Sequence, residues 1–172
     1  MDRKPSRVAL RRAIEQPFLY RGVSSLEVKT VDVIEGTNSA EVAFYATTIH
    51  RNDDRLTGTP WPVVCAEQTM ADTARVLRAL WTGAPNLEGA TLKVLRRGAI
   101  DSAADETILH LRATGEAIKR VMRRTGRDAS AHLLRCCEMR YAFDPQYGLR
   151  ALTEKTAVGC ADEGRGSRAA QP

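Results

Sequence analysis

The sequence predicts an α+β fold, a two-layer sandwich in which two helices pack on a mixed sheet. Polar and apolar residues alternate over 107–113, which is the period of a half-buried strand, and the segment 26–34 is rich in the β-branched residues that strands favour. Apolar residues recur at helical spacing over 70–82 and 116–126, which predicts two amphipathic helices. The chain has 172 residues, a length that suits one domain with some additional segments.

The first sixty residues are expected to form a short helix and an extra β-hairpin. A helix is predicted over 7–16 and should stop at Pro17, because proline has no backbone N–H to donate. The β-branched segment 26–34 and the segment 41–50 are the two predicted strands, and 35–39 supplies the turn. The predicted division of the chain is an N-terminal extension, a main domain and a disordered tail, at 1–60, 61–158 and 159–172.

The next segment is predicted to run from a strand into a helix. The short apolar run 61–66 is a strand candidate, and Thr69 resembles a helix N-cap with Asp72 three residues later. The helix 70–82 should then end at the Gly-Ala-Pro sequence of 83–85.

The second half of the chain repeats this alternation of strands and helices. A strand is also compatible with 90–95, whereas 96–106 gives no clear signal. The segment 107–113 alternates as a strand does, and the helix 116–126 should end at its glycine. A long hairpin is expected to follow, with two strands and an Asp-Pro-Gln-Tyr-Gly turn, at 133–143, 149–158 and 144–148.

Composition and charge favour a globular protein with an anionic partner. Lys and Arg number 26 against 21 Asp and Glu, a net charge of +5, which favours association with polyanions. No apolar run approaches the length of a membrane span, so no membrane partner is expected. The basic N-terminus has no hydrophobic segment after it, so the cytoplasm or the nucleus is expected; a weak organelle-targeting segment stays open as the alternative.

The basic side chains of the helix 116–126 and its surroundings are the principal candidate site. Its apolar residues form one stripe, and its basic residues fill the other side; the latter are Lys119, Arg120, Arg123, Arg124 and Arg127. On one continuous helix the four arginines would share a face, and their mutual repulsion would favour a bound polyanion. The alternative is a solvated face whose arginines pair with acids elsewhere in the fold.

Three further residues extend this candidate site. Gly115 stands at the junction of strand and helix, where a side chain would keep a phosphate from the helix N-terminus. Arg112 precedes it at the margin of the basic surface, and Arg140 extends that surface on the predicted hairpin.

The segment Leu109–Val121, "LHLRATGEAIKRV", resembles the strand–glycine–helix segment of the Alba-type DNA- and RNA-binding proteins. These include the small subunits of RNase P and RNase MRP. The resemblance implies nucleic-acid binding through the second helix, neighbouring loops and the hairpin. It also implies a homo- or heterodimer with a related Alba-type chain. The expected function is therefore binding of a phosphate backbone, RNA in preference to DNA, without enzymatic activity and without a cofactor.

Other chemistries have weaker support. The four cysteines include no C-x-x-C pair, and the three histidines are scattered, so no metal site and no catalytic residue is predicted. Two alternatives remain open. One is a curved-sheet, cone-shaped binding protein or enzyme similar to nuclear transport factor and ketosteroid isomerase, which a cavity would favour. The other is a structural subunit of a ribonucleoprotein.

Overall fold

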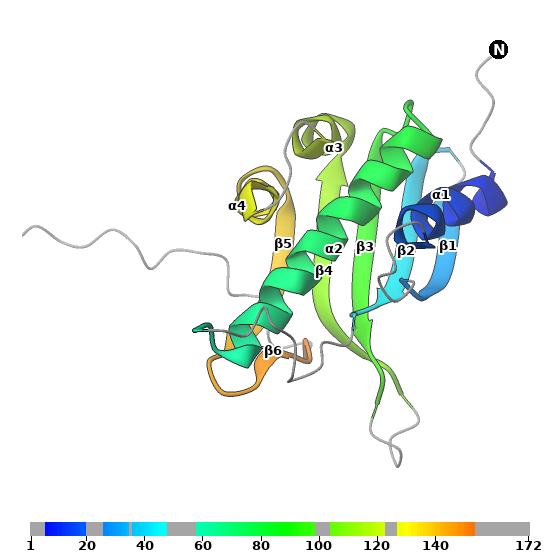
Figure 1. The fold of residues 1–172 in the computed structure, drawn as a ribbon. Helices are drawn as coiled ribbons and strands as arrows, with labels where there is room; N and C mark the ends of the chain where they lie inside the picture. The colour runs from blue at the N-terminus through cyan, green and yellow to red at the C-terminus, as the bar shows by residue number, and fades with distance from the viewer. Residues whose placement is uncertain are drawn as a thin grey trace, which may run out of the picture.

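The computed structural model has an α+β fold, as predicted, with a six-stranded mixed sheet and four helices among the residues that it describes (Figure 1). The described residues are 6–19, 26–34, 36–47, 58–98, 104–122 and 127–153, with side chains left out at 16–19 and 127–130.

The six strands lie side by side in the order in which they occur in the chain. Their bounds are Val28–Ile34 (β1), Ser39–Tyr45 (β2), Gly89–Arg96 (β3), Glu106–Thr114 (β4), Glu138–Asp144 (β5) and Gly148–Arg150 (β6). All neighbours are antiparallel except β2 and β3, which are parallel over their whole length. A parallel pair needs a crossover, and α2, Trp61–Gly83, supplies it.

The N-terminal segment belongs to this sheet. The two predicted strands are present as β1 and β2, and Gly36 and Asn38 take positive φ angles of 93° and 42° in the turn between them. Because β2 also pairs with β3, the boundary suggested at residue 60 lies inside the β2–α2–β3 crossover. The first helix, α1, runs over Arg7–Leu19. The prediction that it stops at Pro17 was wrong, because the helix continues through Pro17 to Leu19.

Residues 61–66 were predicted as a strand and are instead the first turns of α2. The apolar run was misleading, because Pro62 stands in the first turn of the helix, where its missing N–H has no partner to lose. Thr69 is consequently not an N-cap. It lies within α2, nearly buried, and its hydroxyl donates to the carbonyl of Cys65 at 2.9 Å.

The central strand β3 lies between α2 and β4. The candidate 90–95 is confirmed within it, and the prediction of a strand at 107–113 is confirmed as β4. The two pair along most of their length, with a register shift near Leu95.

The predicted helix 116–126 is confirmed over 116–122 as α3, which covers Gly115–Met122, and residues 123–126 lie outside the described residues. A further helix, α4, covers Arg127–Cys136 and was not predicted. The strand predicted from residue 133 therefore begins only at Glu138. Leu133 was assigned to a strand face, but it is a fully buried residue of α4. The sequence pattern failed here because an apolar residue every fourth position in a short helix resembles part of an alternating strand.

The turn at 144–148 is confirmed, but β6 is much shorter than the predicted strand 149–158. Asp144 Oδ1 accepts the backbone N–H of Gln146 at 2.8 Å, and Gly148 takes a φ of 81° that favours glycine. The end of the predicted strand, 154–158, lies outside the described residues.

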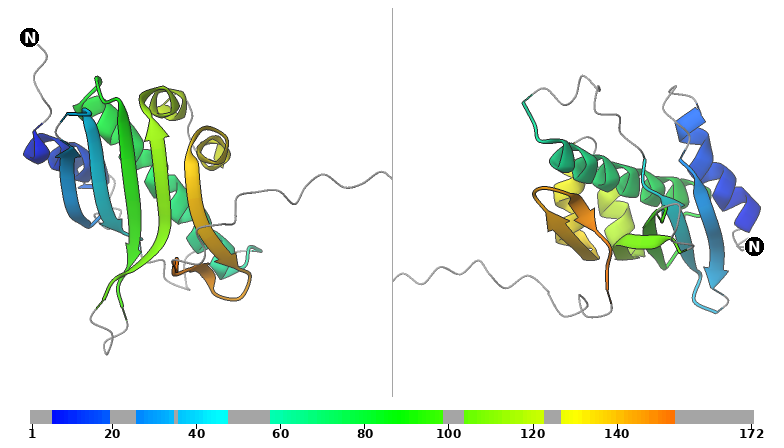
Figure 2. Two further views of the ribbon diagram at one scale, coloured as in Figure 1. Left: turned by 180° about the vertical axis from the view of Figure 1, so that it is seen from behind. Right: turned by 90° about the horizontal axis from the view of Figure 1, so that it is seen from below.

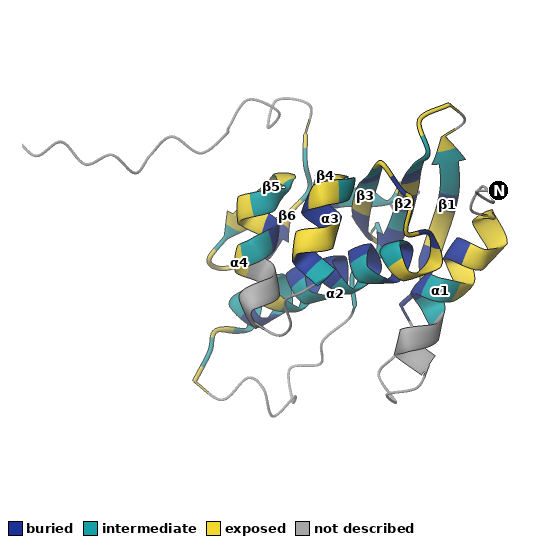
Figure 3. Ribbon diagram, turned by 90° about the horizontal axis from the view of Figure 1, so that it is seen from above, coloured by how far each residue is buried: buried dark blue, intermediate teal, exposed yellow. Residues whose placement is uncertain are grey.

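All four helices lie on one face of the sheet, and the opposite face of the sheet is not covered by any described element (Figures 2 and 3). The core fills the space between helices and sheet; its largest members include Phe44, Leu77, Leu92, Leu109 and Ile118. None of the described helices combines the length and the apolar character that crossing a membrane requires.

Candidate functional site

The uncovered face of the sheet carries a group of basic side chains on its central strands. On β3, β4 and β5, the residues Lys93, His110 and Arg140 are successive cross-strand partners and form one row. Arg112 lies in the next row, between Thr91 and Glu138. Directly opposite residues in a sheet have Cβ atoms about 5 Å apart, so these side chains are immediate neighbours. We call Lys93, His110, Arg112 and Arg140 the open-face cluster.

Strand alternation places the cluster on this face. In β4, Leu109 and Leu111 are fully buried on the helix side, so His110 and Arg112 point the opposite way. In β3, Leu92 is buried on the helix side in the same manner, and Lys93 is exposed on the other face. Burial of the leucines therefore places the charged side chains on the open face, because a register slip of one residue would bury these charged side chains.

The open-face cluster carries more positive charge than its surroundings balance. Lys93, Arg112 and Arg140 are exposed. Arg140 pairs with Glu138 at 3.6 Å, a surface contact that contributes little stability. Among the described residues, neither Lys93 nor Arg112 has an ion-pair partner.

His110 lies in the middle of these cations. Its pKa is lowered from the usual 6.5, first by burial and then by the charges of Arg112, Lys93 and Arg140, while Glu138 acts in the opposite direction. The imidazole is consequently neutral at pH 7, and the cluster combines three permanent cations with one ring that can gain a proton.

The helix α3 carries only part of the basic surface predicted for it. Lys119 pairs with Glu116 at 3.0 Å and lies 5.2 Å from the centre of the Trp81 ring. Arg120 is exposed and has no ion pair with any residue that the structure describes.

The described part of α3 ends at Met122, before the second of the four arginines that were expected to share a face. Arg123 and Arg124 lie outside the described residues, and Arg127 begins α4 with its side chain likewise left out. The shared face of the four arginines therefore stays a prediction, and the structure describes only Lys119 and Arg120 among the predicted basic residues of this segment.

Gly115 has a packing role at the start of α3. Its N–H donates to the carbonyl of Glu88 at 2.8 Å, and a Cβ added to it would lie 2.6 Å from the carbonyl oxygen of Leu87. The hydroxyl of Thr114 accepts the N–H of Ala117 at 3.2 Å, as an N-cap does. Two of the N–H groups that a phosphate would need are thus already bonded within the protein.

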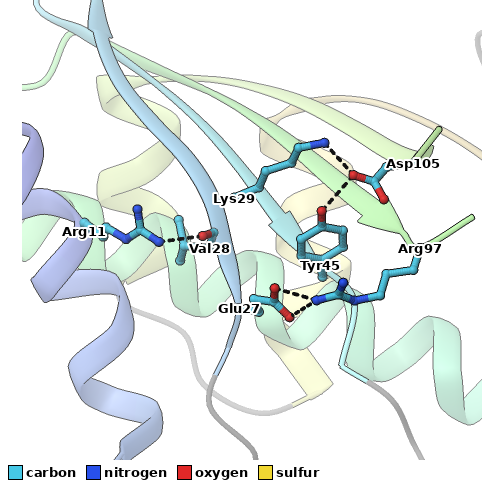
Figure 4. Close-up of polar contacts among 7 residues, drawn as sticks. All are labelled: Arg11, Glu27, Val28, Lys29, Tyr45, Arg97 and Asp105. Atoms are coloured by element: carbon cyan, nitrogen blue, oxygen red, sulfur yellow. Dashed lines mark hydrogen bonds and ion pairs between the residues drawn. The ribbon is translucent and has the colours of Figure 1, made fainter. Parts of the chain in front are cut away.

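A second polar cluster, at another end of the same sheet, has its charges paired (Figure 4). Asp105 accepts from Lys29 Nζ at 2.5 Å and from Tyr45 Oη at 2.7 Å, and these hydrogen bonds lower the pKa of its carboxyl. Arg97 pairs with Glu27 and lies over the ring of Tyr45 at 4.6 Å. These contacts tie β1 and β2 to the ends of β3 and β4, and they leave no unbalanced charge.

Two of the eight predicted site residues, Arg112 and Arg140, come together on the open face, and two cluster members were missed. Lys93 and His110 each stand between apolar residues, so alternation alone marks them as surface positions. Only the pairing of β3 with β4 and of β4 with β5 brings them beside the arginines. Lys119 and Arg120 belong to the helix layer (Figure 3).

The structure shows no alternative metal chemistry in the part of the chain that it describes, where no three His, Cys, Asp or Glu residues are grouped to hold an ion. Cys65, Cys136 and Cys137 are free thiols, and burial raises the pKa of Cys137 to about 11, so its thiol stays protonated.

Comparison of the chain with family models, with curated proteins and with solved structures finds no match. Membership of the Alba-type proteins stays a prediction from the segment Leu109–Val121. Residues 61–66, predicted as a strand, are helical, and two strands, β3 and β4, lie between α2 and α3.

Proposed function

We propose that the protein binds the phosphate backbone of a nucleic acid, RNA in preference to DNA, on the open face of its sheet. The observation that carries this proposal is the row of Lys93, His110 and Arg140 with Arg112 beside it, on a face that no described helix covers. The protein is proposed to act as a binding protein and not as an enzyme.

The electrostatics support an anionic ligand. Strands in a sheet are about 4.8 Å apart, so Lys93 and Arg140, two strands apart, are separated by about 10 Å. Two positive charges at this separation still repel one another, although less than directly opposite charges do. A phosphate placed between them would relieve this repulsion, and a chain of phosphates could meet several of the cations in succession.

The shape of the site favours a single strand over a duplex. Proteins read duplex DNA with a helix or a two-stranded ribbon inserted in a groove, whereas the open-face cluster lies on the surface of a broad sheet. Single-stranded RNA instead exposes its bases, which stack on aromatic rings including histidine. His110 supplies such a ring between Lys93 and Arg140.

We also propose roles for two residues of α3, a dimer and a location in the cell. Lys119 and Arg120 would contact phosphates that continue beyond the sheet toward the helix layer. The sequence alone supports a dimer with a related chain and residence in the cytoplasm or nucleus. Light scattering of the purified protein would test for the dimer.

A charge-reversal experiment tests the proposed function. Equilibrium binding of a single-stranded RNA and of a duplex DNA would be measured for the wild type and for the double variant K93E/R112E. The matched control is R12E/R135E, which reverses two exposed arginines on α1 and α4 and changes the net charge equally. We expect the first variant to lose at least tenfold in RNA affinity while the control loses much less. Equal losses in the two variants would show that only net charge matters, and the open face would not be the site.

A further inference from the structure

A cavity of about 200 Å³ lies between the helix layer and the sheet, on the side away from the open-face cluster. It is bounded by the first turns of α2, the ends of β2, β3 and β4 near those turns, and the β5–β6 hairpin (Figure 1, lower end of α2). Thr69, Ile108 and Leu149 in its lining are buried, whereas Arg96 and Tyr147 are exposed, and the cavity is partly open to solvent.

The hairpin that closes the cavity is fixed at several points. Arg96 donates to the carbonyl of Leu149 at 3.1 Å, and the backbone N–H of Leu152 donates to Thr107 at 2.7 Å. Gly148 approaches α2 so closely that an added Cβ would lie 3.3 Å from the carbonyl oxygen of Pro62. The walls of the cavity are therefore held by specific contacts from β3, β4 and α2.

The walls of the cavity are mainly apolar, and the two threonine hydroxyls among them can accept hydrogen bonds but not donate them to a ligand. The hydroxyl of Thr69 donates to the Cys65 carbonyl, and that of Thr47 donates to Asp72 at 2.7 Å. With their protons engaged, both hydroxyl oxygens can only accept a further hydrogen bond. Burial raises the pKa of Cys65, so its thiol is protonated.

The described residues that line this cavity offer an ionised ligand no free counter-charge. Arg96 is bonded to Glu106 through Nε and Nη2, at 3.0 and 2.7 Å, so its charge is balanced. None of the described lining residues carries a carboxylate, which the cone-shaped enzymes named as an alternative would use. Burying a charge without a partner is costly, so this lining favours a neutral molecule.

We propose that this cavity binds a small, neutral, mainly apolar molecule, about the size of one substituted aromatic ring, whose hydrogen-bond donor meets the hydroxyl oxygens of Thr47 and Thr69. An apolar cavity of about 150 Å³ is known to hold benzene, so the available volume admits a ring with one polar substituent. This binding activity is independent of the nucleic-acid binding proposed above.

Phenol, toluene and benzoate are suitable probes, because they share one ring and differ in polar group and charge. Binding to the full chain would be measured by titration calorimetry and by the shift in unfolding temperature. We expect phenol to bind at least fivefold more tightly than toluene, and benzoate not to bind. Phenol should also slow alkylation of Cys65 but not of Cys136, which lies outside the cavity.

Two threonines of α2 provide a matched pair of variants. Thr69→Val removes an oxygen that lines the cavity, whereas Thr73→Val removes an equally buried hydroxyl that donates to the Thr69 carbonyl at 2.7 Å and does not line the cavity. Thr69→Val should abolish the preference for phenol over toluene, and Thr73→Val should preserve it. An unchanged preference in Thr69→Val would overturn the assigned hydrogen bond, and failure of both phenol and toluene to bind the wild type would overturn the cavity as a binding site.

Discussion

Lys93 on β3 and His110 on β4 are direct cross-strand partners on the face of the sheet that the helices leave uncovered. Arg140 follows His110 on β5, and Arg112 lies one row away, with Glu138 as its neighbour. The histidine is thus surrounded by charges from three strands, and its protonation is coupled to them.

The first prediction concerns RNA affinity as a function of pH. The pKa of His110 lies below 6.5 in the free protein, and a bound phosphate would raise it. RNA affinity should therefore increase as pH falls from 7.5 to about 5.5, because binding takes up a proton. His110→Asn should remove most of this increase, while His132→Asn, on α4, should leave it unchanged. Identical pH profiles for the two variants would rule out His110 as the responsible group.

The same histidine predicts a loss of stability in acid. Because the pKa of His110 is lower in the folded than in the unfolded chain, the unfolded chain binds the proton first as pH falls. Its contribution to the free energy of unfolding is complete above about pH 6.5 and is lost as pH falls from there toward the folded-state pKa. Urea unfolding at pH 7.5 and 5.5 should show a smaller decrease for His110→Asn than for the wild type.

Gly115→Ala should destabilise the protein although alanine is the better helix former. The added Cβ would lie 2.6 Å from the Leu87 carbonyl oxygen, so α3 or the 87–88 segment must move. We expect a loss of about 1–3 kcal/mol in urea unfolding, the usual cost of overpacking. Arg120→Ala, at an exposed position on the same helix, is the control and should change stability by less than about 0.5 kcal/mol. A stable Gly115→Ala variant would contradict the close packing of α3.

Asp72→Asn should also be destabilising, because it disturbs a nearly buried carboxylate on α2. Asp72 is 1% exposed and accepts hydrogen bonds from Thr47 at 2.7 Å and Gln68 at 2.8 Å. Asparagine keeps only one of the two accepting oxygens and loses the negative charge that pairs with Arg75 at 3.2 Å, so the variant should lose about 1–3 kcal/mol. Glu67→Gln, an exposed position on the same helix, should have almost no effect. Calorimetric unfolding of both variants measures the difference in stability between them.

The sequence was informative where a segment has a single strong period. Strand β4 follows from alternation, the β1–β2 pair follows from its β-branched residues and the turn between the two strands, and the 144–148 turn follows from its Asp-Pro and glycine. The errors occurred where apolar residues are compatible with two structures. Residues 61–66 are helical, with Pro62 in the first helical turn, and Leu133 is a fully buried residue of α4.

Much of the candidate site could not be predicted from the sequence, because it is made by pairing between strands. Arg112 and Arg140 were identified from their charge, but 27 positions separate them and only the β4–β5 register brings them close. Helix α4 was not predicted, because its residues from Leu133 onward were assigned to a strand. The role of Gly115 depends on a distant segment, Leu87–Glu88, which local patterns cannot indicate.

The salt dependence of RNA binding tests the central claim most directly. Single-strand binding weakens with a log–log slope of about −0.7 per phosphate contact, so K93Q/R112Q/R140Q should flatten the slope by about two units. The control R7Q/R12Q/R135Q removes three exposed charges from α1 and α4 and should keep the slope of the wild type. If the two triple variants show the same slope, the open-face cluster does not contact the phosphate backbone.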